Sequence, residues 1–396
     1  MQLQQFNANW HYPTSIWVGI GRINELTCAC QELAMKKPLL ITDPFLAKLE
    51  LVNNALTILA EQGISCQLFS AIKANPCGDN ITAGVKAFLQ GEHDGVIALG
   101  GGSALDAGKA IALMVGQTRS LWDFEDIDDN YLRANKEGIA KIIAIPTTSG
   151  TGSEVGRAAV ITDTRDIEHP IKRIIFHPDM LPQIVILDAQ LTQALPSSLT
   201  AATGMDALSH ALEAYCASYF HPMAEGIALE AIRLIKEYLP TATENGDDLL
   251  ARTQVMTAAT MGATAFQRGL GGMHALAHAI GALYDSHHGL LNAILMPYVL
   301  KANEAAITLK ITRLSRYLQL TSDDSELGFD SFLQWILLLR QQLAIPHTLA
   351  EIAIDTRKAR QIGQMALQDA SAAGNPIAFN AKQYRDIFKS AVQGEL

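Results

Sequence analysis

The sequence of 396 residues predicts an α/β domain followed by an all-helical domain. In the first half, short β-rich runs alternate with amphipathic stretches of helical length, a pattern typical of parallel strands joined by crossover helices. After residue 188, apolar residues recur with a helical period and β-branched runs become rare. We therefore expect an open, mostly parallel sheet in residues 1–192 and an all-α domain in residues 193–396. Two domains also agree with the length, since one domain typically holds roughly 100–200 residues.

Five runs in the first half have the composition of buried strands. Each is short and rich in aliphatic residues, and the runs are 39–42, 65–69, 95–99, 142–145 and 184–187. Ligands of open parallel sheets bind beyond the carboxyl ends of the strands. The residues that follow these runs are therefore where we expect a binding site.

The second half begins with a polar stretch at residues 194–200, which is expected to connect the two domains. Beyond it, several stretches carry apolar residues at helical spacing. The clearest of them are 230–238, 249–261, 275–283, 332–343 and 384–392. We expect each of these stretches to be a helix.

The composition narrows the partners of the chain. Hydrophobic residues make up 49% and charged residues 18%, which is typical of a globular protein, and the net charge of −10 argues against nucleic-acid or anionic-membrane surfaces.

No apolar run is long enough to span a bilayer, and the first residues lack the pattern of a secretory signal, so a cytoplasmic location is expected. Five cysteines without a C-x-x-C pair indicate reduced thiols. We expect a small-molecule partner and a homodimer or larger homo-oligomer.

A glycine cluster follows the strand expected at residues 95–99. Gly100, Gly101 and Gly102 precede a helical stretch that begins near Ser103. Glycines let a backbone approach a pyrophosphate closely, and a helix N-terminus offers unpaired N–H groups with a partial positive charge. This segment therefore favours phosphate binding, although tight turns alone also select glycine. The spacing does not match the G-x-G-x-x-G fingerprint of dinucleotide-binding proteins.

A second polar loop, at residues 146–154, follows the strand expected at 142–145. It is rich in hydroxyl groups and glycines, which suit ribose and phosphate oxygens. The alternative is a helix N-cap region that satisfies only its own backbone. Asp43, which follows the run 39–42, is a candidate acceptor for the adenosine ribose hydroxyls. Its negative charge is expected to repel a 2′-phosphate and to favour NAD over NADP.

One carboxylate and five imidazoles stand out in the apolar second half. They are Asp206, His210, His274, His278, His287 and His288. The first two, and likewise the third and fourth, are four residues apart, so each pair stacks on one face of a helix. Imidazole is seldom found in apolar helices without a partner, because its desolvation is costly. A catalytic divalent metal explains the group, and the residue types alone fit zinc and ferrous iron equally.

Four motifs, taken in order, resemble the iron-containing (group III) alcohol dehydrogenases over nearly the whole chain. They are Gly100-Gly101-Gly102-Ser103 with Asp106 and Lys109, residues 146–154, Gly204-x-Asp206-Ala207-x-x-His210, and His274-x-x-x-His278 followed by His288-Gly289. The resemblance implies an N-terminal dinucleotide-binding α/β domain and a C-terminal helical domain, with NAD and a metal meeting in the cleft. It also implies ferrous iron as the ion, with zinc as the alternative.

The resemblance assigns roles residue by residue. The positions that match metal ligands are Asp206, His210, His274 and His288. His278 matches a histidine near the substrate that is not usually a ligand, and His287 has no assigned role. The positions that resemble cofactor contacts are Asp43, Asn75, Gly101, Gly102, Ser103, Asp106, Thr147, Thr148, Thr151, Val160 and Lys172.

Two departures from the family pattern affect the expected pockets. Many relatives have Thr where this chain has Gly156, so a hydroxyl contact to the cofactor is missing. The segment 265–271 is one residue shorter than the common pattern, and it places Arg268 beside the metal-binding segment. A cationic side chain at that place is expected to favour an acidic substrate.

The activity implied by the resemblance is the reversible NAD-linked oxidation of an alcohol to an aldehyde or ketone. Hydride passes directly between carbon and the nicotinamide, the metal polarises the substrate oxygen, and His278 exchanges a proton with solvent. One alternative is a sugar-phosphate cyclase of the dehydroquinate synthase type, which needs several basic residues for a phosphate, whereas the metal-binding segments show chiefly Arg268. The other is a catalytically silent protein that binds NAD and metal.

Overall fold

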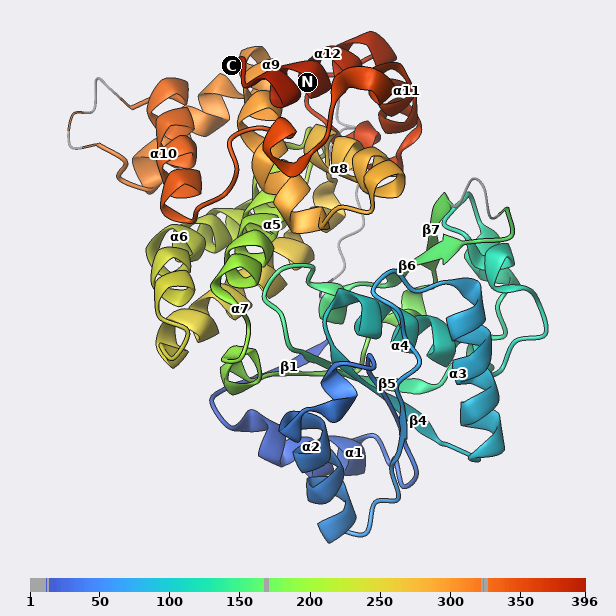
Figure 1. Cartoon of the computed structure of the whole chain (residues 1–396). Coiled ribbons are helices and arrows are strands. Elements are labelled where there is room, and N and C mark those ends of the chain that lie inside the picture. Colours follow the sequence, from blue (N-terminus) through green and yellow to red (C-terminus); the bar gives the residue numbers. More distant parts are fainter. Residues whose placement is uncertain (1–11, 13, 167–170, 322, 324–326) are drawn as a thin grey trace. The chain divides into compact units, whose positions relative to one another are not determined.

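The computed structural model describes residues 12, 14–166, 171–321, 323 and 327–396 (Figure 1). These residues form two compact units, one of them Tyr12–Ala194 and the other Leu195–Leu396. The first unit contains the β-strands, and the second is built from helices. The predicted fold class is confirmed, with a parallel α/β unit followed by a helical unit.

The first unit is organised around a six-stranded parallel sheet. Its strands are β1 (Ser15–Val18), β2 (Leu39–Ile41), β3 (Gln67–Phe69), β4 (Gly95–Gly100), β5 (Lys141–Pro146) and β8 (Ile184–Leu187). They lie in the order β1-β8-β5-β4-β2-β3. All five predicted strands are present. The edge strand β1 was not predicted, because a four-residue segment with exposed ends carries little apolar signal.

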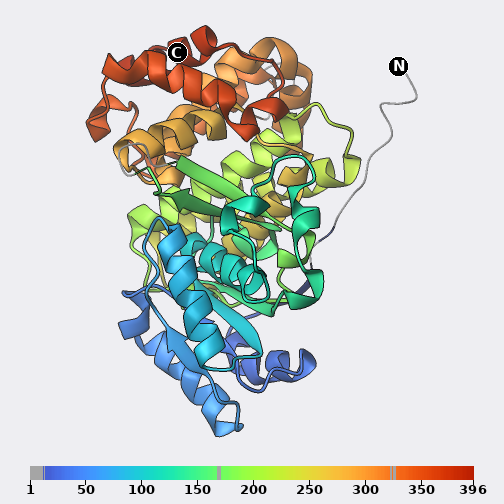
Figure 2. The same cartoon turned by 90° about the vertical axis from the view of Figure 1, so that its right-hand side faces the viewer.

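Helices cover both faces of this sheet. On one face, α1 (Leu26–Glu32) and α2 (Glu50–Glu61) pack on a core that includes Ile97 and Leu99 of β4. On the other face lies α4 (Gly102–Met114), which in turn packs against α3 (Gly78–Gln90), as the side view shows (Figure 2). The chain thus crosses over between parallel strands on both faces, as a doubly wound sheet requires.

Gly108 sets how closely α4 approaches the sheet. A Cβ atom added at Gly108 would lie 2.6 Å from the Cβ of Ala98 on β4, a separation that real Cβ atoms do not show. The helix can therefore rest directly on the central strand only because this position has no side chain. This contact fixes the height of the α4 N-terminus above the carboxyl end of β4.

A two-stranded antiparallel hairpin stands beside the sheet. It consists of β6 (Ala158–Asp163) and β7 (Ile171–Phe176), and the backbone N–H of Thr162 on β6 donates to the carbonyl of Pro76 at 2.8 Å. The sequence did not predict these strands, because polar and charged residues interrupt their apolar alternation. The hairpin carries Val160, one of the predicted cofactor residues.

The second unit contains the long helices α5 (Ser197–Cys216), α6 (Pro222–Glu244), α7 (Leu249–Ala265), α8 (Gly272–Tyr284), α9 (His288–Tyr317), α10 (Phe329–Gln342), α11 (Ala359–Gln368) and α12 (Ala381–Gln393). Four of the five predicted helical stretches lie within one of them, and the fifth, 332–343, runs one residue past the end of α10. The central helix is α5, which is buried at every position from Thr200 to Cys216 and packs against α6, α7 and α9. A helix enclosed in this way is apolar on all sides, so its few polar residues need partners inside the protein.

All five cysteines are free thiols, as the sequence predicted. Cys28 and Cys30 lie on α1, the first exposed and the second buried, as ordinary helix residues do. Among the described residues, no helix combines the length and the apolar character needed to cross a membrane.

The close packing of α4 gives a stability test. Replacing Gly108 by Ala should lower the free energy of unfolding by about 1–3 kcal/mol, because the new methyl group overlaps Ala98. Gly226→Ala in α6 is the matched control, since nothing lies within 4 Å of its added Cβ. That substitution should stabilise the protein by about 0.5–1 kcal/mol through helix propensity. Chemical denaturation measures both; equal stability of the two variants would contradict the assigned packing.

Candidate metal centre and dinucleotide loop

Three helices of the second unit supply the polar cluster. Asp206, His210 and Glu213 lie on α5 at positions i, i+4 and i+7, so their side chains leave one face of the helix. His274 and His278 occupy one face of α8 in the same way, and His288 is the first residue of α9. The cluster therefore forms where the beginnings of α8 and α9 meet the middle of α5.

Asp206, His210 and His274 form the compact part of the cluster. One ligand atom from each lies within 4.8 Å of the others, and all three residues are buried. His288 is farther out, with its Nε2 atom 3.6 Å from Oδ1 of Asp206. The structure thus brings three of the four predicted ligands into one group and places the fourth beside it.

The imidazole rings are stacked around this group. The His210 and His274 rings have centroids 4.6 Å apart and lie nearly parallel, and the His278 and His288 rings are 5.1 Å apart. Phe266 covers His210 at 5.2 Å. Stacking of this kind limits the rotation of each ring and so restricts the positions of its two nitrogens.

The charged groups in the cluster shift one another's pKa values. Burial alone raises the pKa of Asp206, but His210, His288, His274 and a hydrogen bond from Asn292 outweigh it and lower the pKa to about 2. Burial lowers the pKa of His288 well below its ordinary value. For His274, burial acts in the same direction, but the charge of Glu213 and its hydrogen bond raise the pKa. The result is an ionised carboxylate surrounded by imidazoles, which is the donor set that a divalent metal requires.

Asn292 closes the cluster from α9, one turn after His288. Its Nδ2 atom donates to Oδ1 of Asp206 at 2.8 Å and lies 3.2 Å and 3.1 Å from Nε2 of His274 and His288. Its Oδ1 atom is buried and has no hydrogen-bond partner among the described residues. Three atoms that can bind a cation therefore converge on a partly positive N–H₂ group, and the residues present fit a divalent ion.

Two further carboxylates contact the histidines of α8. Oε2 of Glu213 lies 2.7 Å from Nδ1 of His274, and Oδ2 of Asp369 lies 2.9 Å from Nδ1 of His278. Burial is the largest single influence on the pKa of Asp369 and raises it, but the hydrogen bond and charge of His278 together with hydrogen bonds from Ser371 outweigh burial, so the pKa is lowered. Because a carboxylate holds Nδ1 of each ring, the Nε2 atom is the one left for a metal or a substrate.

The remaining two residues highlighted by the sequence have structural contacts. His287 is the N-cap of α9, where its Nδ1 accepts a hydrogen bond from the backbone of Leu290 at 3.3 Å. Arg268 is buried, donates to the carbonyls of Tyr219 and Tyr215, and pairs with Glu225 at 2.7 Å. The guanidinium of Arg268 is therefore engaged by internal partners, and the structure gives no support to its expected preference for an acidic substrate.

In the first unit, the predicted cofactor residues gather at the start of α4. Gly101 is the N-cap of this helix, without a side-chain cap, and Gly102 begins it. A Cβ at Gly102 would lie 2.8 Å from the Thr151 side chain, so the loop after β5 can lie against the glycine loop only because this position is glycine. The backbone N–H of Thr147 donates to the carbonyl of Gly100 at 3.0 Å, and Thr148 lies near Gly101. Bare N–H groups at this helix end suit an anionic pyrophosphate.

Asp106 has internal partners for both of its carboxylate oxygens. Oδ1 accepts from the Ser153 hydroxyl at 2.5 Å and lies 3.2 Å from Nζ of Lys109, while Oδ2 accepts from the backbone N–H of Val160 at 3.0 Å. Burial lowers the pKa of Lys109, and the Asp106 charge acts against that shift. Asp106 and Val160 thus tie α4 to the neighbouring loop and hairpin. A Cβ added at Gly156 would make only ordinary contacts, the nearest being 3.5 Å.

The other predicted cofactor residues follow neighbouring strand ends. Asp43, just after β2, accepts backbone hydrogen bonds from Phe45 and Leu46 at 2.8 Å and 3.0 Å. Asn75 is exposed in the loop after β3, and the hydroxyl of Ser103 donates to the carbonyl of the adjacent Ala74. Lys172 lies on β7, opposite Thr162.

Sequence reasoning missed four polar residues, of which three contact side chains of the metal cluster and the fourth contacts the start of α8. They are Glu213, Asn292, Asp369 and Asn375. The first two had a local signal, since Glu213 follows His210 by three residues and Asn292 follows His288 by four, and both spacings keep one helix face. The last two lie in the segment between α11 and α12 and carry no such signal.

Comparison with known proteins agrees with this geometry. The family model described as iron-containing alcohol dehydrogenase matches residues 13–189, and the model described as Fe-containing alcohol dehydrogenase family, C-terminal, matches residues 200–392. A 1,3-propanediol dehydrogenase of Citrobacter freundii is 34% identical, with 97% of this chain and 97% of that protein covered. A 4-hydroxybutyrate dehydrogenase of Cupriavidus necator is 33% identical, with 96% and 99% covered.

A solved structure supports the same assignment. The crystal structure of a 1,3-propanediol oxidoreductase superposes with a TM-score of 0.91 at 33% identity, covering 97% of this chain and 100% of that one. Both halves of the sequence and the complete fold therefore match one group of enzymes. The chain belongs to the iron-containing alcohol dehydrogenase family, as its sequence motifs predicted.

Proposed function

We propose that this protein catalyses the reversible, NAD-linked interconversion of an alcohol and an aldehyde or ketone by direct hydride transfer. The observation that carries the proposal is the buried group of Asp206, His210 and His274 in a member of this family. Bound there, a divalent ion, ferrous iron or alternatively zinc, supplies polarisation of the substrate oxygen. Asp206, His210 and His274 would hold this ion together with His288.

His278 is proposed to move the proton of the reaction. Its side chain is about one quarter exposed, whereas His274 is almost completely buried, so His278 can exchange a proton with water. Asp369 accepts the hydrogen bond of Nδ1 and thereby leaves Nε2 to take or give the proton. Oxidation of an alcohol releases one proton for each hydride that NAD⁺ accepts, and we propose that this histidine carries it away.

The cofactor is proposed to lie along the carboxyl ends of four neighbouring strands. The N–H groups of Gly101 and Gly102 at the start of α4 would hold the pyrophosphate, with Ser103 beside them. Asp43 at the end of β2 would accept the adenosine ribose hydroxyls. The further contacts we propose are Asn75, Thr147, Thr148, Thr151, Val160 and Lys172, with Asp106 acting through the loop and the hairpin that it fixes.

Three further features remain proposals. The division of contacts at residue 194 supports two domains with a boundary near residue 192. Five free thiols support a reducing, cytoplasmic location. A symmetric dimer or larger homo-oligomer rests on the frequency of such assemblies among soluble proteins.

The structure disfavours a sugar-phosphate cyclase. Such an enzyme needs basic side chains that are available to a substrate phosphate, and Arg268, the residue that the sequence offered for this role, is buried against Glu225. The two reactions also differ in their net use of the cofactor. A cyclase regenerates its NAD within each turnover, whereas a dehydrogenase that oxidises an alcohol accumulates NADH. Net NADH production from simple alcohols, followed by its absorbance, tests the proposed reaction, and full turnover without NADH accumulation would refute it.

Loss of one ligand tests the metal centre. His274→Ala should abolish both metal retention and turnover, because the most deeply buried imidazole of the cluster is removed. Metal analysis of anaerobically purified protein measures the first effect, and NADH formation measures the second. His287→Ala is the matched control on the neighbouring helix start and should keep both properties at a cost of about 1 kcal/mol in stability. A metal-replete, fully active His274→Ala enzyme would refute the assignment.

Asp369→Asn tests the proton path. The neutral amide weakens the hold on Nδ1 of His278, so kcat should fall by about 10–100-fold while the metal content stays at the wild-type level. Asp355→Asn serves as the control, because that aspartate caps a short exposed helix elsewhere in the same unit. Unchanged kcat in Asp369→Asn would exclude this role for the His278 and Asp369 pair.

Asp43→Asn tests cofactor choice. The amide can still accept the two backbone hydrogen bonds, but the negative charge that repels a 2′-phosphate is gone. The ratio of kcat/KM for NADP to kcat/KM for NAD should rise by about tenfold, which corresponds to about 1.4 kcal/mol. Asp79→Asn on α3 removes the same charge from an exposed site and should leave the ratio unchanged. The same ratio in Asp43→Asn and wild type would place the ribose elsewhere.

A further inference from the structure

We infer that Glu213 is a positioning residue of the metal centre, whose carboxylate holds His274 in the tautomer that presents Nε2 to the ion. This inference rests on the proposed metal site. It concerns a residue that binds neither metal nor substrate and acts only through His274. The contacts of Glu213, the contacts of His274 and the packing around both residues support it.

The first observation is the set of donors around the Glu213 carboxylate. Oε2 accepts from the backbone N–H of Gly271 at 2.7 Å and from Nδ1 of His274 at 2.7 Å, and Oε1 accepts from the backbone N–H of Met273 at 2.6 Å. Glu213 is buried, so water does not replace these contacts. The two oxygens act only as acceptors, and the ring nitrogen that faces them must therefore carry the hydrogen.

The second observation comes from the other side of the His274 ring. Nε2 lies 3.2 Å from Nδ2 of Asn292, an amide group that can only donate. The N–H₂ group has two hydrogens for three neighbours, Asp206 and the Nε2 atoms of His274 and His288, and a lone pair on Nε2 of His274 is compatible with this contact. The Glu213 contact thus assigns the tautomer, with hydrogen on Nδ1 and a metal-binding lone pair on Nε2, and the Asn292 contact agrees with it.

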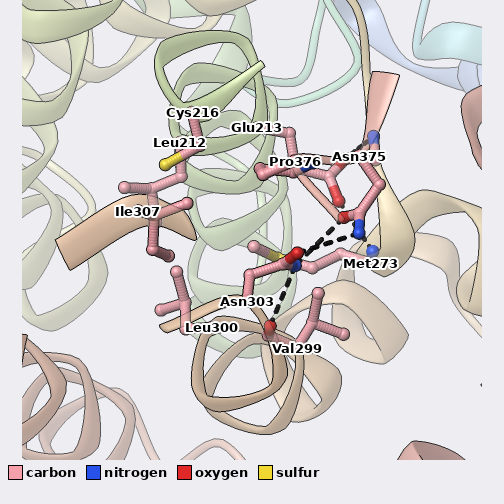
Figure 3. Close-up of a pocket in the computed structure, with 11 residues that line it drawn as sticks. Leu212, Glu213, Cys216, Met273, Val299, Leu300, Asn303, Ile307, Asn375 and Pro376 are labelled. Carbon is pink, nitrogen blue, oxygen red and sulfur yellow. Dashed lines mark hydrogen bonds between the residues drawn. The ribbon is translucent and has the colours of Figure 1, made fainter. Parts of the chain in front are cut away.

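The third observation is the rigidity of this arrangement, because the start of α8 cannot move away from Glu213. The backbone N–H of Gly272 donates to Oδ1 of Asn375 at 2.9 Å. Asn375 and Asn303 exchange side-chain hydrogen bonds at 2.9 Å and 3.0 Å (Figure 3). A Cβ added at Gly271 would lie 3.0 Å from both Glu213 and Asn375. The backbone N–H groups of residues 271, 272 and 273 thus all donate to buried side chains.

The space beside this network does not offer Glu213 another position. The cavity lined by Glu213, Asn303 and Asn375 measures about 10 Å³, and most of its other lining residues are apolar (Figure 3). That volume is about that of one water probe, so little free space lies beside the carboxylate. Glu213 is consequently fixed in the geometry that orients His274.

The expected effect is on metal affinity. Carboxylates that orient metal-bound histidines typically change affinity by about 10–100-fold when they are removed. In Glu213→Gln, one amide N–H₂ group must face a backbone N–H or Nδ1 of His274. At the Oε2 position the N–H₂ group faces Nδ1 of His274 and releases the ring from its tautomer. At the Oε1 position it opposes the backbone N–H of Met273 and leaves Nδ1 to a neutral amide oxygen, which is a weaker acceptor than the carboxylate. The dissociation constant for Co²⁺, a spectroscopic substitute for iron or zinc, should rise by about 10–100-fold.

Competition with a fluorescent chelator measures this constant, and the visible spectrum of bound Co²⁺ reports its coordination. Asn375→Ala is the matched control, because it removes one acceptor from the α8 N-terminus without touching His274. It should lower the melting temperature of the metal-free protein but change the Co²⁺ dissociation constant by less than about threefold. If Glu213→Gln does not fold by circular dichroism, Glu213→Asp, which withdraws the carboxylate by one methylene, is judged by the same criterion.

The outcomes separate this inference from the proposed function. Weaker Co²⁺ binding in Glu213→Gln than in Asn375→Ala, with an altered Co²⁺ spectrum, supports the positioning role. Wild-type affinity in Glu213→Gln, or an equal loss in both variants, refutes this role and leaves the metal centre intact. Absence of Co²⁺ binding in the wild-type protein refutes the metal centre itself, and the positioning role with it.

Discussion

The burial of one charged carboxylate, Asp206, is the constraint on which the helical unit depends. A helix enclosed on all sides cannot expose this charge to water, and an isolated buried carboxylate costs several kcal/mol. The surrounding helices must therefore deliver compensating groups, which are the imidazoles of α5, α8 and α9 and the amide of Asn292. The beginnings of α8 and α9 supply two of these imidazoles, and α9 also supplies the amide.

The sequence predicted what depends on local spacing. The pairs four residues apart placed Asp206 with His210 and His274 with His278, and apolar runs located five of the six parallel strands. It did not predict contacts between distant segments. Local sequence around Glu213 does not indicate that its partner, His274, lies 61 residues away, and local sequence around Asp369 does not indicate His278, 91 residues away. The hairpin β6–β7 was missed for another reason, since charged residues such as Arg173 alternate with its apolar ones and pair with Glu125 and Asp163.

Asp106 shows how one carboxylate can connect three separate segments of the first unit. Its two oxygens accept hydrogen bonds from Ser153 and Val160. Both the loop after β5 and the hairpin are thereby attached to the first turns of α4. Gly108 meanwhile fixes that helix against β4. The glycine loop is therefore held by contacts on three sides, and a backbone that is already ordered loses little conformational entropy when it receives a phosphate group.

The residues that steady α8 come from widely separated parts of the chain. Asp369 and Asn375 lie shortly before the last helix, α12, whereas Glu213 lies more than 150 residues earlier. During synthesis the ribosome delivers Asp206 and His210 long before these last contacts exist. The cluster therefore reaches its final form only when almost the entire polypeptide has emerged, and tight retention of an ion is coupled to completion of the chain.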